Sequence, residues 1–274
     1  MIASPPLSPT GTAPNRRTRT MPFARRLPAA ALLAVGLAAA GPLVRPAAAA
    51  DPFTPAQEAA IEAIVQDYIA RNPELVLEAI AAIEARQKAE KERVAQAALI
   101  AHRDVLERNP ADPVLGNPDG DVTIVEFFDY QCGYCKTMVG PMRELVEGDG
   151  KVRWVLKEFP ILGPESMVAA RASLAAGRQD KYEAFHFTLM GLRGRLSEAA
   201  IWQAASEAGL DLERLRKDMA DPAIEAAINA NYQLAQALQI EGTPAFTIGD
   251  TLIPGAAPKE HLAALLKKAR DGKG

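Results

Sequence analysis

The sequence predicts an α/β domain with a long helical segment in front of it. Three observations predict this class. A short, β-branched apolar strand at Val122–Phe128 runs directly into a helix, and a second strand follows at 151–159. Two further short apolar strands near 245–253 form a hairpin, whereas the residues between 163 and about 240 show only helical patterns. Strands that alternate with helices are the mark of an α/β domain.

The first 50 residues differ in composition from the rest of the chain. They hold six arginines, no lysine and no acidic residue, and an apolar run at 27–43 precedes the alanines that end at Ala50. A basic segment, an apolar segment and a small-residue site are typical of a secretory signal peptide cleaved near Asp51. A membrane span needs ~20 apolar residues, more than this run provides. We therefore expect residues 1–50 to be a signal peptide and the mature chain to have no stable membrane insertion.

The charge of the mature chain excludes one class of partner. The whole chain has 31 basic and 34 acidic residues, and six of the arginines fall in the first 50 positions. The remainder has 25 basic residues against 34 acidic ones, a formal charge of −9. Nucleic acids attract basic surfaces, so we expect no nucleic-acid partner.

Residues 51–110 are predicted to form a helical arm. Thr54 and Gln57 make a helix-start signal, Pro73 begins a second helix, and no helix breaker follows before Pro110. We expect the outer apolar group to contact another subunit and the inner group to contact the following domain, across a charged stretch at 86–93. The alternative is one amphipathic helix packed on its own domain. The outer group is Val76, Ile80 and Ile83, and the inner group is Val94, Ala98, Ala101 and Val105.

Two cysteines, Cys132 and Cys135, lie where the first strand passes into its helix. The start of a helix offers unpaired backbone N–H groups and the positive end of the helix dipole, and both favour a thiolate. The spacing suits a disulfide, but the loop it closes is too small to stabilise the fold much. These are the only cysteines in the chain. The pattern indicates a redox-active pair, and the alternative is two incidental buried thiols.

The remaining elements complete a second domain at 111–274. The two strands flanking the first helix should be parallel, as in a βαβ unit. Several helices at about 163–240 form an insertion, with Ser197, Asp211 and Asp221 as N-caps. The hairpin and a closing amphipathic helix at 258–270 end the domain.

This order of elements, with Cys-x-x-Cys at the first strand-to-helix junction and Thr243-Pro244 before the hairpin, resembles the thioredoxin fold. The helical insertion makes the chain similar to the DsbA-like group of bacterial periplasmic thiol–disulfide oxidoreductases, and the arm makes it similar to the ScsC-like members. The resemblance implies a periplasmic enzyme that uses its cysteines and needs no cofactor and no metal.

The resemblance also implies roles for individual residues. Cys132 matches the exposed attacking thiolate, and Cys135 matches the more buried thiol that resolves mixed disulfides. Pro244 matches a cis proline beside the cysteine pair, which would leave the backbone of Thr243 free to pair with an extended substrate. Gly133 and Tyr134 would also contact substrate.

A buried acid precedes the cysteines in this family, and Glu126 is in that position. A carboxylate in a run of Val, Ile and Phe is unfavourable unless it has a partner or a task, such as exchanging the proton of Cys135. Lys157 on the neighbouring strand is the predicted partner of Glu126 in this proton transfer. The alternatives are that Glu126 reaches solvent at a strand edge and that Lys157 has no such role.

The dipeptide between the cysteines favours one activity within the family. Cys-Gly-Tyr-Cys lacks the histidine of the strongest oxidants and, with Thr before the proline, is similar to DsbC-type disulfide isomerases and ScsC-like proteins. The predicted function is therefore a disulfide isomerase or reductase acting on misfolded or mis-disulfided secreted proteins. Its predicted partners are a DsbD/ScsB-like membrane thiol reductase and further copies of the chain, by resemblance a trimer.

Two other functions compete with this prediction. One is a monomeric DsbA-like oxidase that donates disulfides, with the arm folded on its own domain. The other is a Cu(I)-handling protein, since two thiolates suit that ion. The three histidines, His102, His186 and His261, are isolated and lack zinc-ligand spacing. His186, Trp154 and Trp202 are predicted to be core residues.

Overall fold

The computed structural model describes residues 53–272, so the predicted signal peptide at 1–50 lies outside the described part. The chain divides into two compact units, Met1–Glu62 and Ala63–Gly274. The first unit contains the start of helix α1 (Pro55–Arg71), whose residues are all exposed. Thr54 and Gln57 bond reciprocally at this start, with Thr54 N–H donating to Gln57 Oε1 at 2.9 Å and Gln57 N–H donating to Thr54 Oγ1 at 3.4 Å. This is the predicted capping box.

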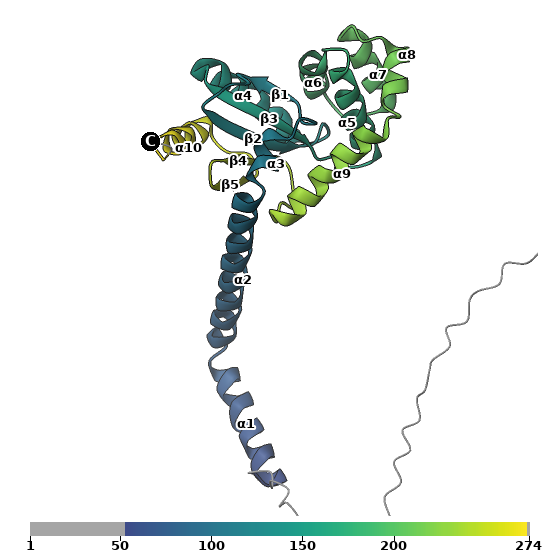
Figure 1. Ribbon diagram of the computed structural model, residues 1–274. Coiled ribbons are helices and arrows are strands. Elements are labelled where there is room, and N and C mark those ends of the chain that lie inside the picture. Colours follow the sequence, from purple (N-terminus) through teal and green to yellow (C-terminus); the bar gives the residue numbers. More distant parts are fainter. Residues whose placement is uncertain (1–52, 273–274) are drawn as a thin grey trace, which may run out of the picture. The chain divides into compact units, whose positions relative to one another are not determined.

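The second unit is built on a five-stranded mixed sheet in the order β1-β3-β2-β4-β5 (Figure 1). β2 and β3 are parallel, as the predicted βαβ unit requires, and the other neighbouring pairs are antiparallel. β1 was not predicted, because a three-residue strand within a turn-rich connection has too little periodicity to be recognised. The strands are β1 (Val114–Gly116), β2 (Val122–Phe128), β3 (Val152–Glu158), β4 (Ala245–Ile248) and β5 (Thr251–Pro254).

Both faces of the central strands are buried, so β2 has no polar–apolar alternation and is buried at every position. Successive side chains of a strand point to opposite faces, and residues paired in register share a face. Glu126 pairs with Leu156, and Phe127 pairs with Lys157. Glu126 and Lys157 therefore lie on opposite faces of the sheet.

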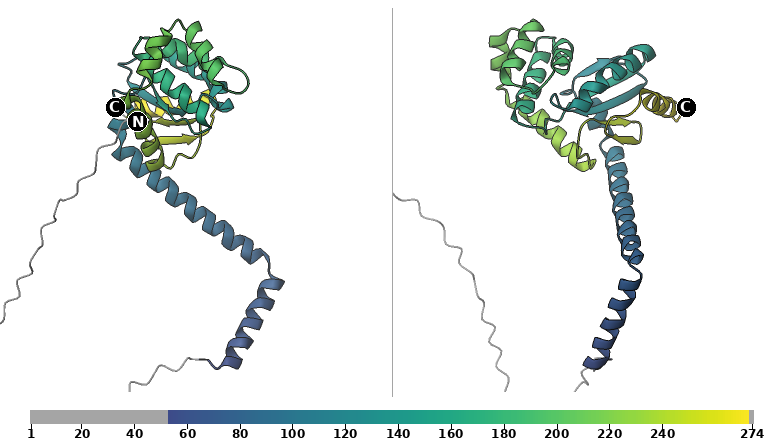
Figure 2. Two further views of the ribbon diagram at one scale, coloured as in Figure 1. Left: turned by 90° about the vertical axis from the view of Figure 1, so that its right-hand side faces the viewer. Right: turned by 180° about the vertical axis from the view of Figure 1, so that it is seen from behind.

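Helices cover each face of the sheet. On one face α4 and α10 pack against the strands, and α6 of the insertion packs against α4. On the other face α3 (Arg103–Arg108) and α9 pack against β2 and β3. Figures 1 and 2 show the insertion towards one edge of this unit and α10 towards the other. The helices after α3 are α4 (Gly133–Asp149), α5 (Pro164–Gly177), α6 (Tyr182–Gly191), α7 (Glu198–Glu207), α8 (Leu212–Asp218), α9 (Pro222–Ala237) and α10 (Lys259–Asp271).

The predicted N-caps of the insertion are present. Ser197, Asp211 and Asp221 each accept a hydrogen bond from a backbone N–H in the first turn of the helix that follows. Such bonds satisfy N–H groups that have no partner within the helix. The five helices α5–α9 thus form the predicted insertion between β3 and β4.

The long helix expected after Pro73 is interrupted once. α2 (Glu74–Ala101) ends at His102, and α3 (Arg103–Arg108) continues the chain. The end of α2 packs on the sheet as predicted, but through Ala95 and Leu99, while α3 contributes Leu106. Of the predicted contacts, Val94 and Ala98 are half-buried and Ala98 packs against this core, whereas Ala101 and Val105 are exposed. The buried positions Ala95, Leu99 and Leu106 keep the spacing of one helical face. They lie one residue after Val94, Ala98 and Val105, so the predicted stripe was displaced by one position.

None of the described helices is long and apolar enough to cross a membrane.

Candidate active site

Cys132 is the N-cap of α4 at the carboxyl end of β2. The backbone N–H of Cys135 donates to Cys132 Sγ at 3.4 Å, and the Cys132 thiol donates to the carbonyl oxygen of Thr243 at 3.3 Å. Hydrogen bonds lower the pKa of Cys132 to about 5. The largest effect comes from the Cys135 thiol, burial opposes it, and the Thr243 side chain and the backbone N–H groups of Cys135 and Tyr134 contribute less. Cys132 is therefore mainly a thiolate at neutral pH.

The pKa of Cys135 is shifted in the opposite direction. Both cysteines are free thiols and belong to the core cluster, with Cys132 6 % and Cys135 1 % exposed. Cys132 is therefore less exposed than the resemblance implies. Burial raises the pKa of Cys135 far above its usual range, and the hydrogen bond to Cys132 and the charge of Glu126 raise it further. The pair thus consists of one nucleophilic sulfur and one sulfur that must lose a proton before it can react.

The segment before β4 lies against the cysteines. The Thr243–Pro244 peptide bond is cis, as the resemblance implies, and the Thr243 carbonyl accepts the thiol hydrogen bond of Cys132. The side chain of Thr243, whose hydroxyl is buried, also helps to lower the pKa of Cys132. Tyr134 is 70 % exposed, and Gly133 borders open space. Gly133 and Tyr134 are thus exposed immediately after Cys132 in the chain.

Glu126 is fully buried on the sheet face that carries α4. Its side-chain partner is the indole of Trp154, whose Nε1–H donates to Glu126 Oε2 at 3.0 Å. Burial raises the pKa of Glu126 to about 8; the bond from Trp154 lowers it and the charge of Cys132 raises it. A carboxyl group with this pKa changes protonation close to neutral pH, which suits a group that takes and returns a proton.

Lys157 is not the partner of Glu126, so that prediction is wrong. Lys157 points to the other face, where it forms a buried ion pair with Asp112 and donates to the carbonyl oxygen of Val105 at 2.8 Å. The two strands that carry the residues were correctly placed side by side. The register between them, which decides which side chains share a face, was not available from sequence.

Asp129 fixes the loop between β2 and Cys132. Its buried carboxylate accepts hydrogen bonds from Gln131 N–H at 2.7 Å, Leu162 N–H at 2.9 Å and the Ser166 hydroxyl at 2.7 Å. Its backbone carbonyl accepts from Cys132 N–H at 3.0 Å. One carboxylate therefore joins the loop before the nucleophile to the loop after β3 and to the first turn of α5.

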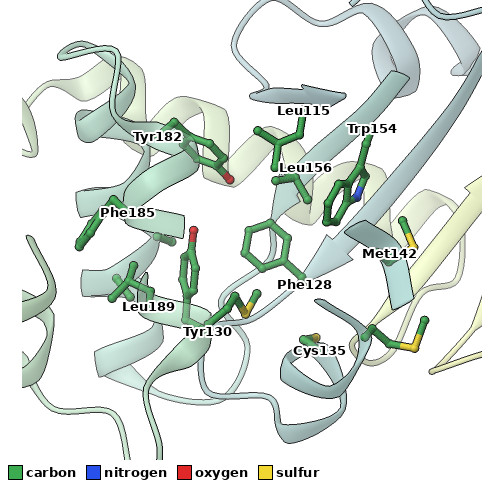
Figure 3. Packing of buried hydrophobic residues seen from close by; sticks show 14 of the residues in the cluster. Leu115, Phe128, Tyr130, Cys135, Met142, Trp154, Leu156, Tyr182, Phe185 and Leu189 are labelled. Atoms are coloured by element: carbon green, nitrogen blue, oxygen red, sulfur yellow. The ribbon is translucent and has the colours of Figure 1, made fainter. Parts of the chain in front are cut away.

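A second buried acid, Glu158, lies further along the same sheet face. The hydroxyls of Tyr130 and Tyr182 both donate to Glu158 Oε1 at 3.1 Å, and Tyr130 also contacts Ser173 and His186. Burial raises the pKa of Glu158 well above its usual range. Figure 3 shows Tyr130 and Tyr182 beside Phe128 in the packed interior. His186 is a core residue as predicted, stacked on Tyr182.

Three features of the site were missed by the sequence analysis. Trp154 was assigned to the core, which is correct, but its hydrogen bond to Glu126 was not foreseen. Asp129 and Glu158 were not singled out, although each is a carboxylate at the end of an apolar strand and could have been noted for that reason. Among residues 53–272, no group of three or more His, Cys, Asp or Glu side chains could hold a metal ion.

A thiolate at a helix start, a buried resolving thiol, a cis proline and a buried acid on a thioredoxin-like sheet together define the class of thiol–disulfide oxidoreductases. Residues 123–267 match the model of the DSBA-like thioredoxin domain family, to which this chain belongs. Residues 57–90 match the model described as the copper resistance protein ScsC N-terminal domain.

Two solved structures illustrate the similarity. A thioredoxin-like oxidoreductase from Silicibacter pomeroyi is 48% identical, with a TM-score of 0.61 over 62% of this chain and 98% of its own. ScsC from Proteus mirabilis, in a transitional conformation, is 31% identical, with a TM-score of 0.61 over 80% of this chain and all of its own. The second similarity covers more of this chain than the first.

A curated relative is much longer than the matching segment. The Na(+)/H(+) antiporter NhaA 1 of Salinispora arenicola is 31% identical over 169 residues, which are 60% of this chain and 26% of the antiporter. The match therefore spans about a quarter of that relative's length.

Proposed function

We propose that the protein is a periplasmic disulfide isomerase or reductase that acts on misfolded or mis-disulfided secreted proteins. The observation that supports the proposal is the difference between the two cysteines. The pKa of Cys132 is low, and the pKa of buried Cys135 is strongly raised. The thiolate of Cys132 attacks a client disulfide, forms a mixed disulfide and releases one client thiolate.

The mixed disulfide then has two fates. In isomerisation, another client thiolate attacks the client sulfur of the mixed disulfide, so a new client disulfide forms and Cys132 leaves as a thiolate without net oxidation. In reduction, Cys135 attacks Cys132 Sγ, the client leaves with both of its thiols reduced, and the Cys132–Cys135 disulfide remains. Two electrons from a DsbD/ScsB-like membrane reductase would restore the pair.

The arm supports the view that several copies act together. Ile64, Leu77 and Ile83 are 67, 70 and 54 % exposed, and similar apolar side chains lie along α1 and the first half of α2. Exposed apolar surface of this extent is typical of an interface. We propose that the arms of several chains, by resemblance three, pack together through these side chains and hold several cysteine pairs around one client.

The alternative of a monomeric oxidase keeps the same cysteine chemistry but leaves the apolar arm residues without a partner, so we favour the oligomer. A role in Cu(I) handling would rest on the cysteine pair. The match of residues 57–90 to the N-terminal domain of the copper resistance protein ScsC favours it.

The test uses residues 51–274 and a scrambled, inactive enzyme with several disulfides. Ile80→Lys with Ile83→Lys places two charges in the exposed apolar part of α2, and Gln87→Lys is a control at a polar position of the same helix. We expect the wild type and the control to be oligomers that reactivate the enzyme, and the double variant to be a monomer that does not. If the double variant is a monomer that still reactivates the enzyme, the arm has another purpose. If the wild type only oxidises reduced clients, the protein is an oxidase.

A further inference from the structure

Trp154 makes a contact that packing alone does not require. Its Nε1–H donates to Glu126 Oε2 at 3.0 Å, while Trp154 is 2 % and Glu126 3 % exposed. Trp154 pairs in register with Ile124, two residues before Glu126 on β2, so the indole lies on the same sheet face as the carboxyl group. A buried indole N–H needs an acceptor, and here the acceptor is the acid beside the cysteines.

The donor is neutral, and this decides what it does to the acid. A lysine in this place would bring a full positive charge and hold the carboxyl group ionised. An indole N–H orients one carboxylate oxygen and favours the charged form, but it leaves the penalty of burial largely in place. Lys157 cannot supply a charge because it is bonded to Asp112 on the other face.

We infer that Trp154 is a positioning residue for thiol–disulfide exchange, because its indole N–H holds the Glu126 carboxylate ready to accept the proton of Cys135. The inference rests on the proposed exchange activity and names one residue that tunes it. The Cys135 proton passes to Glu126, and the new thiolate attacks Cys132 Sγ. The bond between Cys132 and the client sulfur breaks, and the client leaves as a thiolate.

The surroundings of Glu126 contain few other titratable groups. At the start of α4 these are Cys132 and Cys135. The charge of Cys132 raises the pKa of Glu126, and the charge of Glu126 raises the pKa of Cys135. Phe246 of β4 is the apolar residue paired with Glu126. On α6, His186 lies 6.5 Å from the Trp154 ring, and its pKa is lowered by burial to about 3, so it is neutral near pH 7. Glu158 lies further along β3.

The first experiment measures the ionisation of Glu126 directly. The chain has two tryptophans, so Trp202→Phe leaves Trp154 as the only one. In that background, biosynthetic replacement of tryptophan by benzothienylalanine exchanges the indole N–H for sulfur and preserves the shape of the ring. We expect the Glu126 carboxyl ¹³C shift of the reduced protein to titrate about one pH unit higher after the exchange, because a hydrogen bond to the charged form is lost. Trp202→Phe alone should titrate as the wild type does. An unmoved titration after the exchange would overturn the inference, whether or not the protein catalyses exchange.

The second experiment follows the reaction of the reduced protein with glutathione disulfide by acid quenching and mass spectrometry. The sulfur-for-N–H exchange should slow the conversion of the mixed disulfide to the Cys132–Cys135 disulfide roughly tenfold at pH 7 and move its pH profile upwards. Formation of the mixed disulfide depends on Cys132 and should be unchanged. In a Glu126→Gln background the exchange should have no further effect on the conversion. An equal slowing in that background would show that Trp154 acts by packing only. If the wild type forms no disulfide at all, the proposed function fails, while the titration still tests the contact.

Discussion

Each face of the central sheet buries a carboxyl group, Asp112 on one and Glu126 on the other, and the two groups have different partners. On the face that carries α3, Asp112 forms an ion pair with Lys157, so each charge has a partner of opposite sign. Burial raises the pKa of Asp112 and lowers that of Lys157, and each partner opposes the shift of the other. On the face that carries α4, the hydrogen-bond partner of the Glu126 side chain is the neutral indole of Trp154.

This difference in partner distinguishes an acid that stabilises the fold from an acid that can exchange a proton. A buried cation favours the ionised form of its partner carboxylate, and the pair fixes the segments that carry the two residues, here the connection after α3 and strand β3. A carboxyl group with a neutral donor keeps a raised pKa, so it can change its charge while the fold persists. The buried acid beside the cysteines is of the second kind.

Breaking the ion pair should produce the largest effect on stability. Lys157→Met leaves Asp112 buried without a cation, and we expect a loss of about 3–5 kcal/mol in the free energy of unfolding. Urea denaturation at neutral pH measures this loss. Adding Asp112→Asn removes the unpaired charge, so the double variant should regain most of the loss. A single variant as stable as the wild type would show that the pair contributes nothing to the fold.

Glu126→Gln should change how stability depends on pH. The pKa of Glu126 is raised in the folded state, so its contribution to stability is complete below the ordinary glutamate pKa and is lost as the pH rises towards about 8. Between pH 4 and pH 7 the wild type should lose roughly 3 kcal/mol that the variant retains. Urea midpoints at a series of pH values give the comparison, and parallel pH curves for the two proteins would contradict it.

Tyr182→Phe tests a second acid on the α4 face with a smaller change. The variant removes one of the two hydroxyls that donate to Glu158 Oε1 and keeps the ring stacked on His186. We expect a loss of about 1 kcal/mol, since Tyr130 still donates to the same oxygen. Thermal unfolding can detect it, with Tyr134→Phe as a control at an exposed tyrosine. A loss as large as that of Lys157→Met would mean that Glu158 is charged in the folded protein.

The smallest effect is expected on the reactivity of Cys132 when the ion pair on the opposite face of the sheet is broken. Alkylation of Cys132 by iodoacetamide should rise with pH around a midpoint near 5, because hydrogen bonds at the start of α4 lower the pKa of this thiol. Lys157→Met should leave the midpoint unchanged, since Lys157 lies on the opposite face and is already paired. A clear shift would mean that the ion pair on the α3 face influences the nucleophile.

The sequence predicted which residues form the candidate site better than it predicted which side chains contact one another. The cysteine pair follows from a short motif, and the burial of Glu126 from its place in an apolar strand. The cis proline and the role of Glu126 were implied by the resemblance to a known family. The partner of Glu126 depends on the register between β2 and β3, which no local pattern contains. The same holds for the arm, where the face of α2 and α3 that packs on the sheet is displaced by one residue from the predicted stripe.

Asp129 has a consequence for anyone who would shorten this protein. Two of the three donors to its carboxylate, Leu162 and Ser166, belong to the approach to the insertion and to its first turn. A truncated version that replaces the insertion from Gly163 onwards would remove Ser166 and release Leu162, leaving a buried charge next to the segment that carries the nucleophile. The insertion is therefore not a detachable module, and a minimal version of the enzyme has to retain at least the first turn of α5.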